Sequence, residues 1–239
     1  MLKKPLSLVA SIRRRQQEGL LPVISEVKVS SPKEGDLMLG RDPIVVGKTM
    51  NSCPIAGLSV IFIDGVWGGS VELMEQICQC VSVPVLAKGF HTTSNDVEVS
   101  ASAGASAVLL SICMLSDEQL LECNSAAHRF GVETLIEIHD EDGLQRIADL
   151  GIRPDILGIN NRNIMVGETD NGDVSNTERL AAKAPAGTIV LSASAIEGPG
   201  DALRARDAGA DVVLVGTSIL RAADTEKAIN DLVGVGWKL

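Results

Sequence analysis

The chain has 239 residues, a net charge of −10 at pH 7, and a hydrophobic content of 45%. An acidic chain is poorly suited to non-specific binding of nucleic acid or anionic membranes, because both require a cationic surface. No apolar stretch approaches the roughly 20 residues that cross a bilayer, and the N-terminal sequence MLKKPLSLVASIRRRQQEG is too polar for a signal peptide. We therefore expect a soluble, cytoplasmic protein without nucleic-acid or membrane partners.

The cysteines do not predict a metal or redox centre. They are odd in number, lie in periodic segments rather than loops, and show no metal-ligand spacing beyond CQC. Packed, reduced thiols explain them better than a metal site does. The five are Cys53, Cys78, Cys80, Cys113 and Cys123.

Short apolar runs rich in β-branched residues recur along the chain. Their hydrophobic residues are continuous rather than alternating, which is typical of strands buried on both faces. The runs are 21–27, 57–63, 83–87, 107–112, 133–138, 155–159, 188–192 and 211–216. Amphipathic helical stretches lie between them, several opening with an N-capping Ser, Asp or Asn, at 70–81, 94–105, 116–131, 140–151, 176–187 and 199–210.

Eight strand–helix units in a chain of this length predict a (β/α)8 TIM barrel. We expect one domain over 1–239, with residues 1–20 forming a short helical extension before the barrel. A doubly wound sheet is the alternative, but it would place a Gly-rich loop after its first strand, where this chain has KVSSPKEG. The Gly-, Asp- and Asn-rich stretch 165–175 is expected to be a long loop after the sixth strand.

Polar residues gather at the predicted strand ends, where a barrel enzyme builds its active site. Lysines, glutamates, an asparagine and an arginine facing one cavity would supply general acids, general bases and anion ligands. For any one of them, a structural ion-pair network at the barrel mouth is the alternative. The residues are Glu26, Lys28, Ser31, Lys88, Phe90, Glu137, His139, Asn160, Asn161 and Arg162.

Small residues end the last two strands, in SASAI and VGTSIL. In barrel enzymes the loops after strands seven and eight often present backbone N–H groups to a phosphate, and small side chains let the anion approach. The alternative is that small residues merely terminate strands. The candidate phosphate ligands are Ser194, Ala195, Gly216, Thr217 and Ser218.

Taken together, these motifs resemble the indole-3-glycerol phosphate synthase family of tryptophan biosynthesis. ISEVKVSSPKEG resembles the family's E-x-K-x-x-S-P-x-x-G segment, and PVLAKGF resembles P-V-L-x-K-D-F. GVETLIEIHD, LGINNRN and ADVVLVGTSILR also match family segments in order and spacing, and DP at 42–43 marks the start of the first barrel helix. The resemblance runs from ISEVK to the C-terminus.

The resemblance implies a decarboxylating and dehydrating ring closure of 1-(2-carboxyphenylamino)-1-deoxyribulose 5-phosphate, without metal or organic cofactor. Lys88 would be the general acid and Glu137 its acid/base partner. Glu26 and Lys28 would hold the substrate and assist dehydration, and Asn160 would position hydroxyl groups. Substrate contacts are implied at Ser31, Trp67, Phe90, Leu110 and Arg162, and phosphate contacts at Lys28, Ser194, Ala195, Gly216, Thr217 and Ser218.

Several positions depart from the family pattern. The family's S-E-S-G reads SASA, so Ala193 replaces a carboxylate and Ala195 a glycine. Gly89 stands where the family has Asp, and Ile63 with Asp64 replaces its T-E pair. Two alternatives to the synthase therefore stay open: a paralogous lyase or isomerase of another phosphosugar-type substrate, and a catalytically silent phosphate-binding barrel. We expect a monomer or a weak homo-oligomer.

Overall fold

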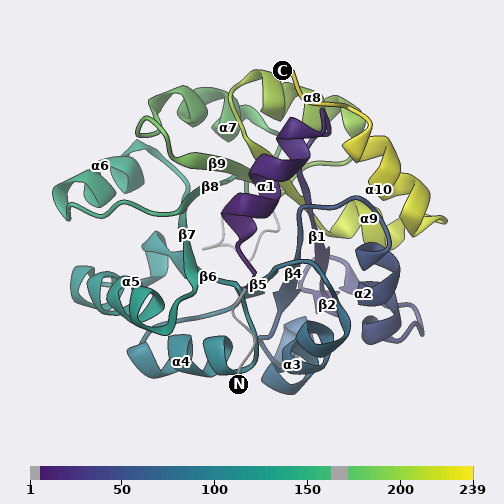
Figure 1. Ribbon diagram of the computed structural model, residues 1–239, viewed down its shortest axis with the longest axis horizontal. Coiled ribbons are helices and arrows are strands. Elements are labelled where there is room, and N and C mark those ends of the chain that lie inside the picture. Colours follow the sequence, from purple (N-terminus) through teal and green to yellow (C-terminus); the bar gives the residue numbers. More distant parts are fainter. Residues whose placement is uncertain (1–5, 163–171, 239) are drawn as a thin grey trace.

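A closed parallel barrel forms the centre of the computed structural model, which describes residues 6–162 and 172–238 (Figure 1). Each strand pairs with the next barrel strand along the chain, and the last strand returns to the first. The strands are β1 (Val23–Val27), β4 (Gly57–Ile61), β5 (Val85–Lys88), β6 (Ala107–Ser111), β7 (Glu133–Ile138), β8 (Ile156–Asn160), β9 (Ile189–Ala193) and β10 (Val212–Val215).

Helices surround this barrel (Figure 1). They are α2 (Pro43–Asn51), α3 (Val71–Cys80), α4 (Ser94–Ser102), α5 (Asp117–Phe130), α6 (Glu141–Asp149), α7 (Ser175–Leu180), α8 (Pro199–Asp207), α9 (Thr217–Arg221) and α10 (Thr225–Val233). A small hairpin of β2 (Ser30–Ser31) and β3 (Gly35–Asp36) follows β1, and a 3₁₀ turn, η1 (Gly65–Trp67), follows β4. Among the described residues, no helix has both the length and the apolar character of a membrane span.

Local sequence signals account for several helix starts. Asp42 accepts a hydrogen bond from the Ile44 N–H at 2.8 Å, and Pro43 occupies the first turn of α2, where its missing N–H has no consequence. Thr93 and Asp96 form a reciprocal capping box at the start of α4, and the same device begins α5. These caps set where each helix leaves the loop that follows a strand.

The strand side chains divide between two hydrophobic clusters because successive residues of a strand point to opposite faces. One cluster fills the barrel interior, and the other lies between the strands and the helices. On β6, Ala107 and Leu109 belong to the interior cluster, whereas Val108 and Leu110 belong to the outer one. This alternation decides which residues at a strand end face the barrel mouth.

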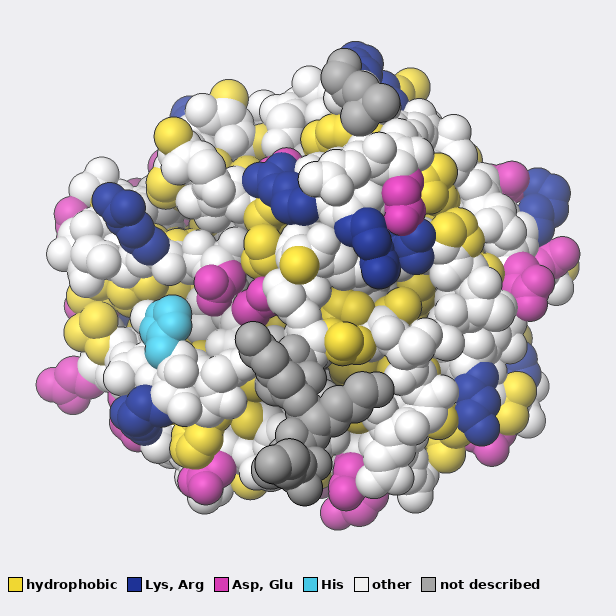
Figure 2. Space-filling model, viewed as in Figure 1, with side chains coloured by type: hydrophobic (Ala, Val, Ile, Leu, Met, Phe, Trp, Pro, Cys, Tyr) yellow, Lys and Arg dark blue, Asp and Glu magenta, His cyan; other side chains and the backbone are white. Residues whose placement is uncertain are grey.

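Helix α1 (Leu8–Gln17) lies across one end of the barrel (Figure 1). Leu8 and Ile12 are fully buried in the interior cluster. The carboxylate of Glu133 accepts hydrogen bonds from the N–H groups of Leu8 at 2.7 Å and Val9 at 3.0 Å, and this charge complements the helix N-terminus. Charged side chains of both signs are scattered over this face among uncharged ones (Figure 2). The opposite end is therefore the one open to a ligand.

The predicted barrel and N-terminal helix are confirmed, and each predicted strand overlaps an observed one. The predicted helix 176–187 is shorter, because α7 ends at Leu180 and a 3₁₀ turn, Ala181–Lys183, precedes Pro185. Of the predicted loop 165–175, residues 165–171 lie outside the described part of the chain.

Candidate active site

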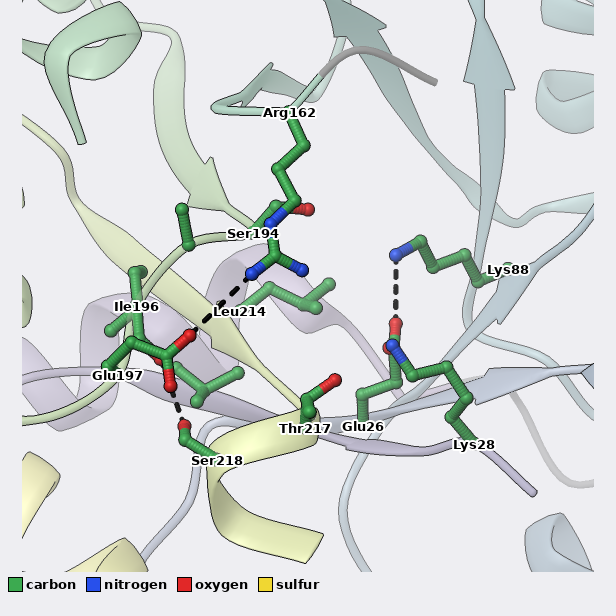
Figure 3. A pocket seen from close by; sticks show the side chains of 13 residues that line it. Glu26, Lys28, Lys88, Arg162, Ser194, Ile196, Glu197, Leu214, Thr217 and Ser218 are labelled. Carbon is green, nitrogen blue, oxygen red and sulfur yellow. Dashed lines mark hydrogen bonds and ion pairs between the residues drawn. The ribbon is translucent and has the colours of Figure 1, made fainter. Parts of the chain in front are cut away.

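A carboxylate between two lysines lies at the open end of the barrel (Figure 3). Glu26 is in β1, Lys28 follows that strand, and Lys88 ends β5. Lys88 Nζ is 2.9 Å from Glu26 Oε2, and Lys28 Nζ is 3.4 Å from Glu26 Oε1. Ser59 of β4 also donates to Oε2, at 3.4 Å. Three strands thus meet at one ionised group.

Burial and charge act in opposite directions on Glu26. Burial raises the pKa of this carboxyl, but the positive charges and hydrogen bonds of Lys88 and Lys28 lower it, and the net result is a pKa below the ordinary value. The side chain is only 3% exposed. Glu26 is therefore an anion that keeps two cations at the barrel mouth.

A polar pocket of about 380 Å³ opens beside this triad (Figure 3). Positive charge enters it from three elements, and the ends of β9 and β10 supply its small residues. Its lining is Glu26, Lys28, Lys88, Arg162, Ser194, Ala195, Ile196, Glu197, Leu214, Val215, Gly216, Thr217 and Ser218. Cations beside exposed backbone form a site suited to an anion such as phosphate.

The backbone of this pocket has two special features. Ser194 and Ala195 have φ angles of 66° and 56°, in the left-handed region that L side chains rarely adopt. Gly216 approaches Glu26 so closely that a Cβ on it would lie 2.8 Å from Oε1. A side chain at position 216 would therefore force the Glu26 carboxylate to move.

Arg162 reaches the same pocket from the end of β8 (Figure 3). Its Nη2 is 3.6 Å from Glu197 Oε1, a carboxylate that is 70% exposed. Its Nε is buried and, among the described residues, has no hydrogen-bond partner. A buried unsatisfied donor is costly, so this guanidinium is suited to an added anionic group.

The ends of β7 and β8 add two buried polar side chains. Glu137 is 4% exposed, and alternation along β7 turns it to the same side as the interior residue Leu135. Asn160, 2% exposed, accepts at Oδ1 from the Arg162 N–H at 2.9 Å. His139 donates from Nδ1 to the Asn160 carbonyl at 3.1 Å. The side chains of Glu137 and Asn160 thus face the barrel interior below the mouth.

Asn161, in contrast, has structural partners. Its amide donates to Ser192 Oγ at 3.0 Å and to the Ala193 carbonyl at 2.9 Å, and its Oδ1 accepts from the Thr177 N–H at 3.1 Å. These bonds join the end of β8 to β9 and α7. The two adjacent asparagines therefore differ in role: Asn160 faces the barrel interior, and Asn161 anchors the end of β8.

A second, apolar pocket of about 400 Å³ also has Lys88 in its lining. Aromatic and aliphatic side chains form most of its wall. Its lining is Ile61, Ile63, Trp67, Lys88, Gly89, Phe90, Leu109 and Ser111. The Trp67 ring centroid is also 5.9 Å from Lys28 Nζ, a cation–π contact. Lys88 thus lines both an anion pocket and a pocket suited to an aromatic ring.

Known proteins are similar in sequence to this chain over most of its length. A family model described as Indole-3-glycerol phosphate synthase matches residues 2–232. The chain belongs to this family. It is 37% identical to the indole-3-glycerol phosphate synthase of Thermococcus kodakarensis over 95% of this chain and 97% of the relative. Identity is 38% with that of Pyrococcus furiosus, covering 89% and 91%, and 32% with that of Halalkalibacterium halodurans, covering 97% and 88%.

Most residues that the family resemblance singled out converge in space. The polar pocket contains Glu26, Lys28, Lys88, Arg162 and all five candidate phosphate ligands. Trp67 and Phe90 line the apolar pocket, and Ser31 joins Lys28, Trp67 and Arg162 around a smaller cavity between them. Within residues 6–162 and 172–238, no group of three or more His, Cys, Asp or Glu side chains is placed to hold a metal ion.

The prediction that Leu110 contacts substrate is corrected by the structure. Leu110 is fully buried in the outer cluster, between the strands and the helices, whereas Leu109 lines the apolar pocket. The two leucines are adjacent, and a shift of one residue along a strand reverses the face. The sequence carries no signal that separates them, because β6 is apolar on both faces.

The departures from the family pattern also have structural settings. A Cβ at Gly89 would lie 2.5 Å from two carbons of the Phe62 ring, so this ring fills the space that an Asp side chain would need. Ala193 belongs to the interior cluster and pairs in register with Asn160. The carboxylate absent at 193 is therefore absent from the site itself. Glu197, which the sequence analysis missed, brings a carboxylate to the pocket from the following loop.

Proposed function

We propose that the chain is an indole-3-glycerol phosphate synthase, a carboxy-lyase that closes the indole ring on 1-(2-carboxyphenylamino)-1-deoxyribulose 5-phosphate. The observation that carries this proposal is that Lys88 lines both an anion pocket and an apolar pocket, with its Nζ 2.9 Å from Glu26 Oε2. A substrate with a phosphate at one end and an aromatic ring at the other would place its reacting carbonyl beside this ammonium.

Ring closure is the first step we assign. A bond forms between the ring carbon that bears the carboxylate and the carbonyl carbon of the deoxyribulose chain. The carbonyl oxygen gains negative charge as this bond forms, and Lys88 protonates it to a hydroxyl. The bond to the carboxylate then breaks, carbon dioxide leaves, and its electron pair restores the aromatic ring.

Loss of water completes the indole. The new hydroxyl leaves after protonation, and a proton is lost from the neighbouring carbon as the double bond forms. We assign Glu137 as the acid/base group of this step and Glu26 with Lys28 as the groups that hold the substrate and assist dehydration. Asn160 and Arg162 would position the sugar hydroxyls and the catalytic charges.

Binding follows from the two pockets. We place the phosphate on the backbone of Ser194, Ala195 and Gly216 and on the start of α9, with Lys28 supplying charge. We place the aromatic ring in the apolar pocket, against Trp67 and Phe90. Such a site needs neither metal nor organic cofactor, because every proton transfer has a side chain assigned to it.

Turnover of the purified protein tests the proposal. The substrate is incubated with the parent chain, Lys88→Ala and Lys48→Ala, and indole fluorescence is followed. We expect turnover by the parent, a loss of about 10²- to 10⁴-fold in Lys88→Ala, and unchanged turnover in Lys48→Ala, since Lys48 is exposed on α2. No product at high parent concentration would reject the activity. Equal rates for the parent and Lys88→Ala would reject the role of Lys88.

A paralogous activity on another phosphorylated substrate is the second candidate, and Ala193 favours it. This residue replaces a family carboxylate at an interior position paired in register with Asn160. The variant Ala193→Glu separates the two. A large gain in indole formation would indicate a weakened synthase. An unchanged or lower rate, together with turnover of another phosphosugar by the parent, would favour the paralogue.

The remaining inferences concern assembly and location. We infer a cytoplasmic enzyme that acts as a monomer or weak homo-oligomer and binds no nucleic acid, in keeping with its net charge of −10. Light scattering after size exclusion, over a range of concentrations, measures the oligomeric state. A stable assembly that persists on dilution would contradict this inference.

A further inference from the structure

Ser111 brings a hydroxyl into the otherwise apolar wall of the second pocket. It is the last residue of β6, two positions beyond Leu109, and both residues line the pocket. Alternation along the strand gives them the same direction. Among the residues that form this wall, Ser111 alone carries a side-chain hydroxyl.

The hydroxyl makes only a weak contact within the protein. Ser111 Oγ lies 3.3 Å from Cys113 Sγ, and a thiol is a poor donor and a poor acceptor. The side chain is nevertheless nearly buried, with 8% of its surface exposed. A nearly buried hydroxyl with a thiol partner keeps most of its hydrogen-bonding capacity for a ligand in the pocket.

The rest of the pocket determines what such a ligand must be. Trp67 and Phe90 offer aromatic surfaces, and Ile61, Ile63 and Leu109 offer aliphatic ones. A planar apolar ring suits this wall, and a small polar substituent is accepted only where it meets a hydrogen-bonding group. The wall near the end of β6 is such a place.

We propose that Ser111 is a specificity-determining residue, which makes the enzyme favour substrates whose aromatic ring carries a hydroxyl or amino group on the edge facing β6. This inference rests on the proposed function, because it takes the ring of that substrate to occupy the apolar pocket. A serine hydroxyl both donates and accepts, so it pairs with either substituent. A methyl group at the same ring position fills similar space and leaves the serine without a strong partner.

The test compares substituents of similar size. Derivatives of 1-(2-carboxyphenylamino)-1-deoxyribulose 5-phosphate are prepared with a hydroxyl or a methyl group at each free ring position, and kcat/KM is measured with the parent and Ser111→Ala. At one position we expect the parent to prefer hydroxyl over methyl by roughly three- to tenfold, the range of one neutral hydrogen bond. Ser111→Ala abolishes or reverses that ratio, and because the ratio is taken between two substrates of the same variant, any general change in rate cancels.

Two further measurements make the result decisive. Cys113→Ala removes the thiol and keeps the hydroxyl, so the preference for hydroxyl persists in this control. The same ratio is measured as binding of non-reactive analogues in which the ribulose carbonyl is reduced to an alcohol. If the unsubstituted substrate is turned over and the ratio is equal in the parent and Ser111→Ala at every position, the role of Ser111 is rejected while the proposed function stands. If nothing is turned over but the binding ratio depends on Ser111, the proposed function is rejected while the role of Ser111 in binding stands.

Discussion

Gly89 follows Lys88 directly, and the ring of Phe62 fills the space where a side chain at position 89 would begin. A Cβ at this position would lie 2.5 Å from Cε1 and Cζ of Phe62 and 3.0 Å from Cδ1. The ring also contacts His91, with centroids 5.2 Å apart. Gly89→Ala is therefore the smallest change that tests whether this packing holds the turn after β5.

The magnitude follows from these distances. Non-bonded carbons prefer a separation of about 3.5–4.0 Å, so the ring or the backbone must move by roughly 1 Å. His91 resists movement of the ring, because it is buried with Nδ1 at 2.8 Å from the Leu109 carbonyl and Nε2 at 2.8 Å from Ser100 Oγ. Overpacking of this kind costs about 1–3 kcal/mol of unfolding free energy. A shift of about 1 Å at Lys88 would also lower kcat by about 100-fold.

Urea unfolding and the indole assay measure both effects. Gly200→Ala is the matched control, because Gly200 lies in α8 and, apart from its chain neighbours and its own helix backbone, no described atom lies within 4 Å of its Cβ position. We expect the control to keep full activity and equal or slightly higher stability. Phe62→Leu combined with Gly89→Ala should be less destabilised than the sum of the single changes, since the smaller side chain relieves the contact. If Gly89→Ala behaves like the control in both assays, the steric argument is refuted.

Three further changes probe the strained backbone at Ala195, the Glu26 charge cluster and the packing of α1 across the closed end of the barrel. Ala195→Gly should raise the unfolding free energy by about 0.5–1 kcal/mol in urea, because it removes the strain of a φ of 56°, and no gain would contradict that strain. Glu26→Gln should cost about 3–5 kcal/mol at pH 7, because the two lysines beside it lose their anion. The folded pKa of Glu26 is below its ordinary value of 4.5, so the stability difference between the parent and Glu26→Gln should shrink as the pH falls below 4.5 and through the folded pKa. A difference that does not change with pH in unfolding titrations would refute this expectation. Leu8→Ala should cost about 2–5 kcal/mol in the same assay. Leu6→Ala, at a residue 41% exposed, should change stability by less than about 0.5 kcal/mol. Equal effects would contradict the packing of α1 against the interior of the barrel.

The strand ends show why so much of the site follows from sequence. A parallel strand buried on both faces is a local pattern of β-branched residues, and the barrel carries all its strand ends to one rim. A polar residue such as Glu26, Lys88 or Glu137 at the end of such a run is therefore placed near the others without knowledge of any contact. The pairing of Glu26 with Lys88 follows from that geometry.

Other features of the site depend on contacts between distant segments. Leu109 and Leu110 are equivalent in a strand that is apolar on both faces. Only closure of the barrel turns Leu109 towards the apolar pocket and Leu110 towards the helices. Glu197 looks like an ordinary loop residue until the end of β8 brings Arg162 within 3.6 Å of it.

The sequence by itself determined the barrel, the N-terminal helix α1 and the set of polar strand ends, because each depends on periodicity and order along the chain. Only the tertiary structure decided how the site is filled. Gly89 illustrates the difference: in the sequence it is a missing carboxylate, and in the structure it is the position that Phe62 leaves no room to occupy. Steric exclusion acts between residues far apart in sequence, and no local pattern encodes it.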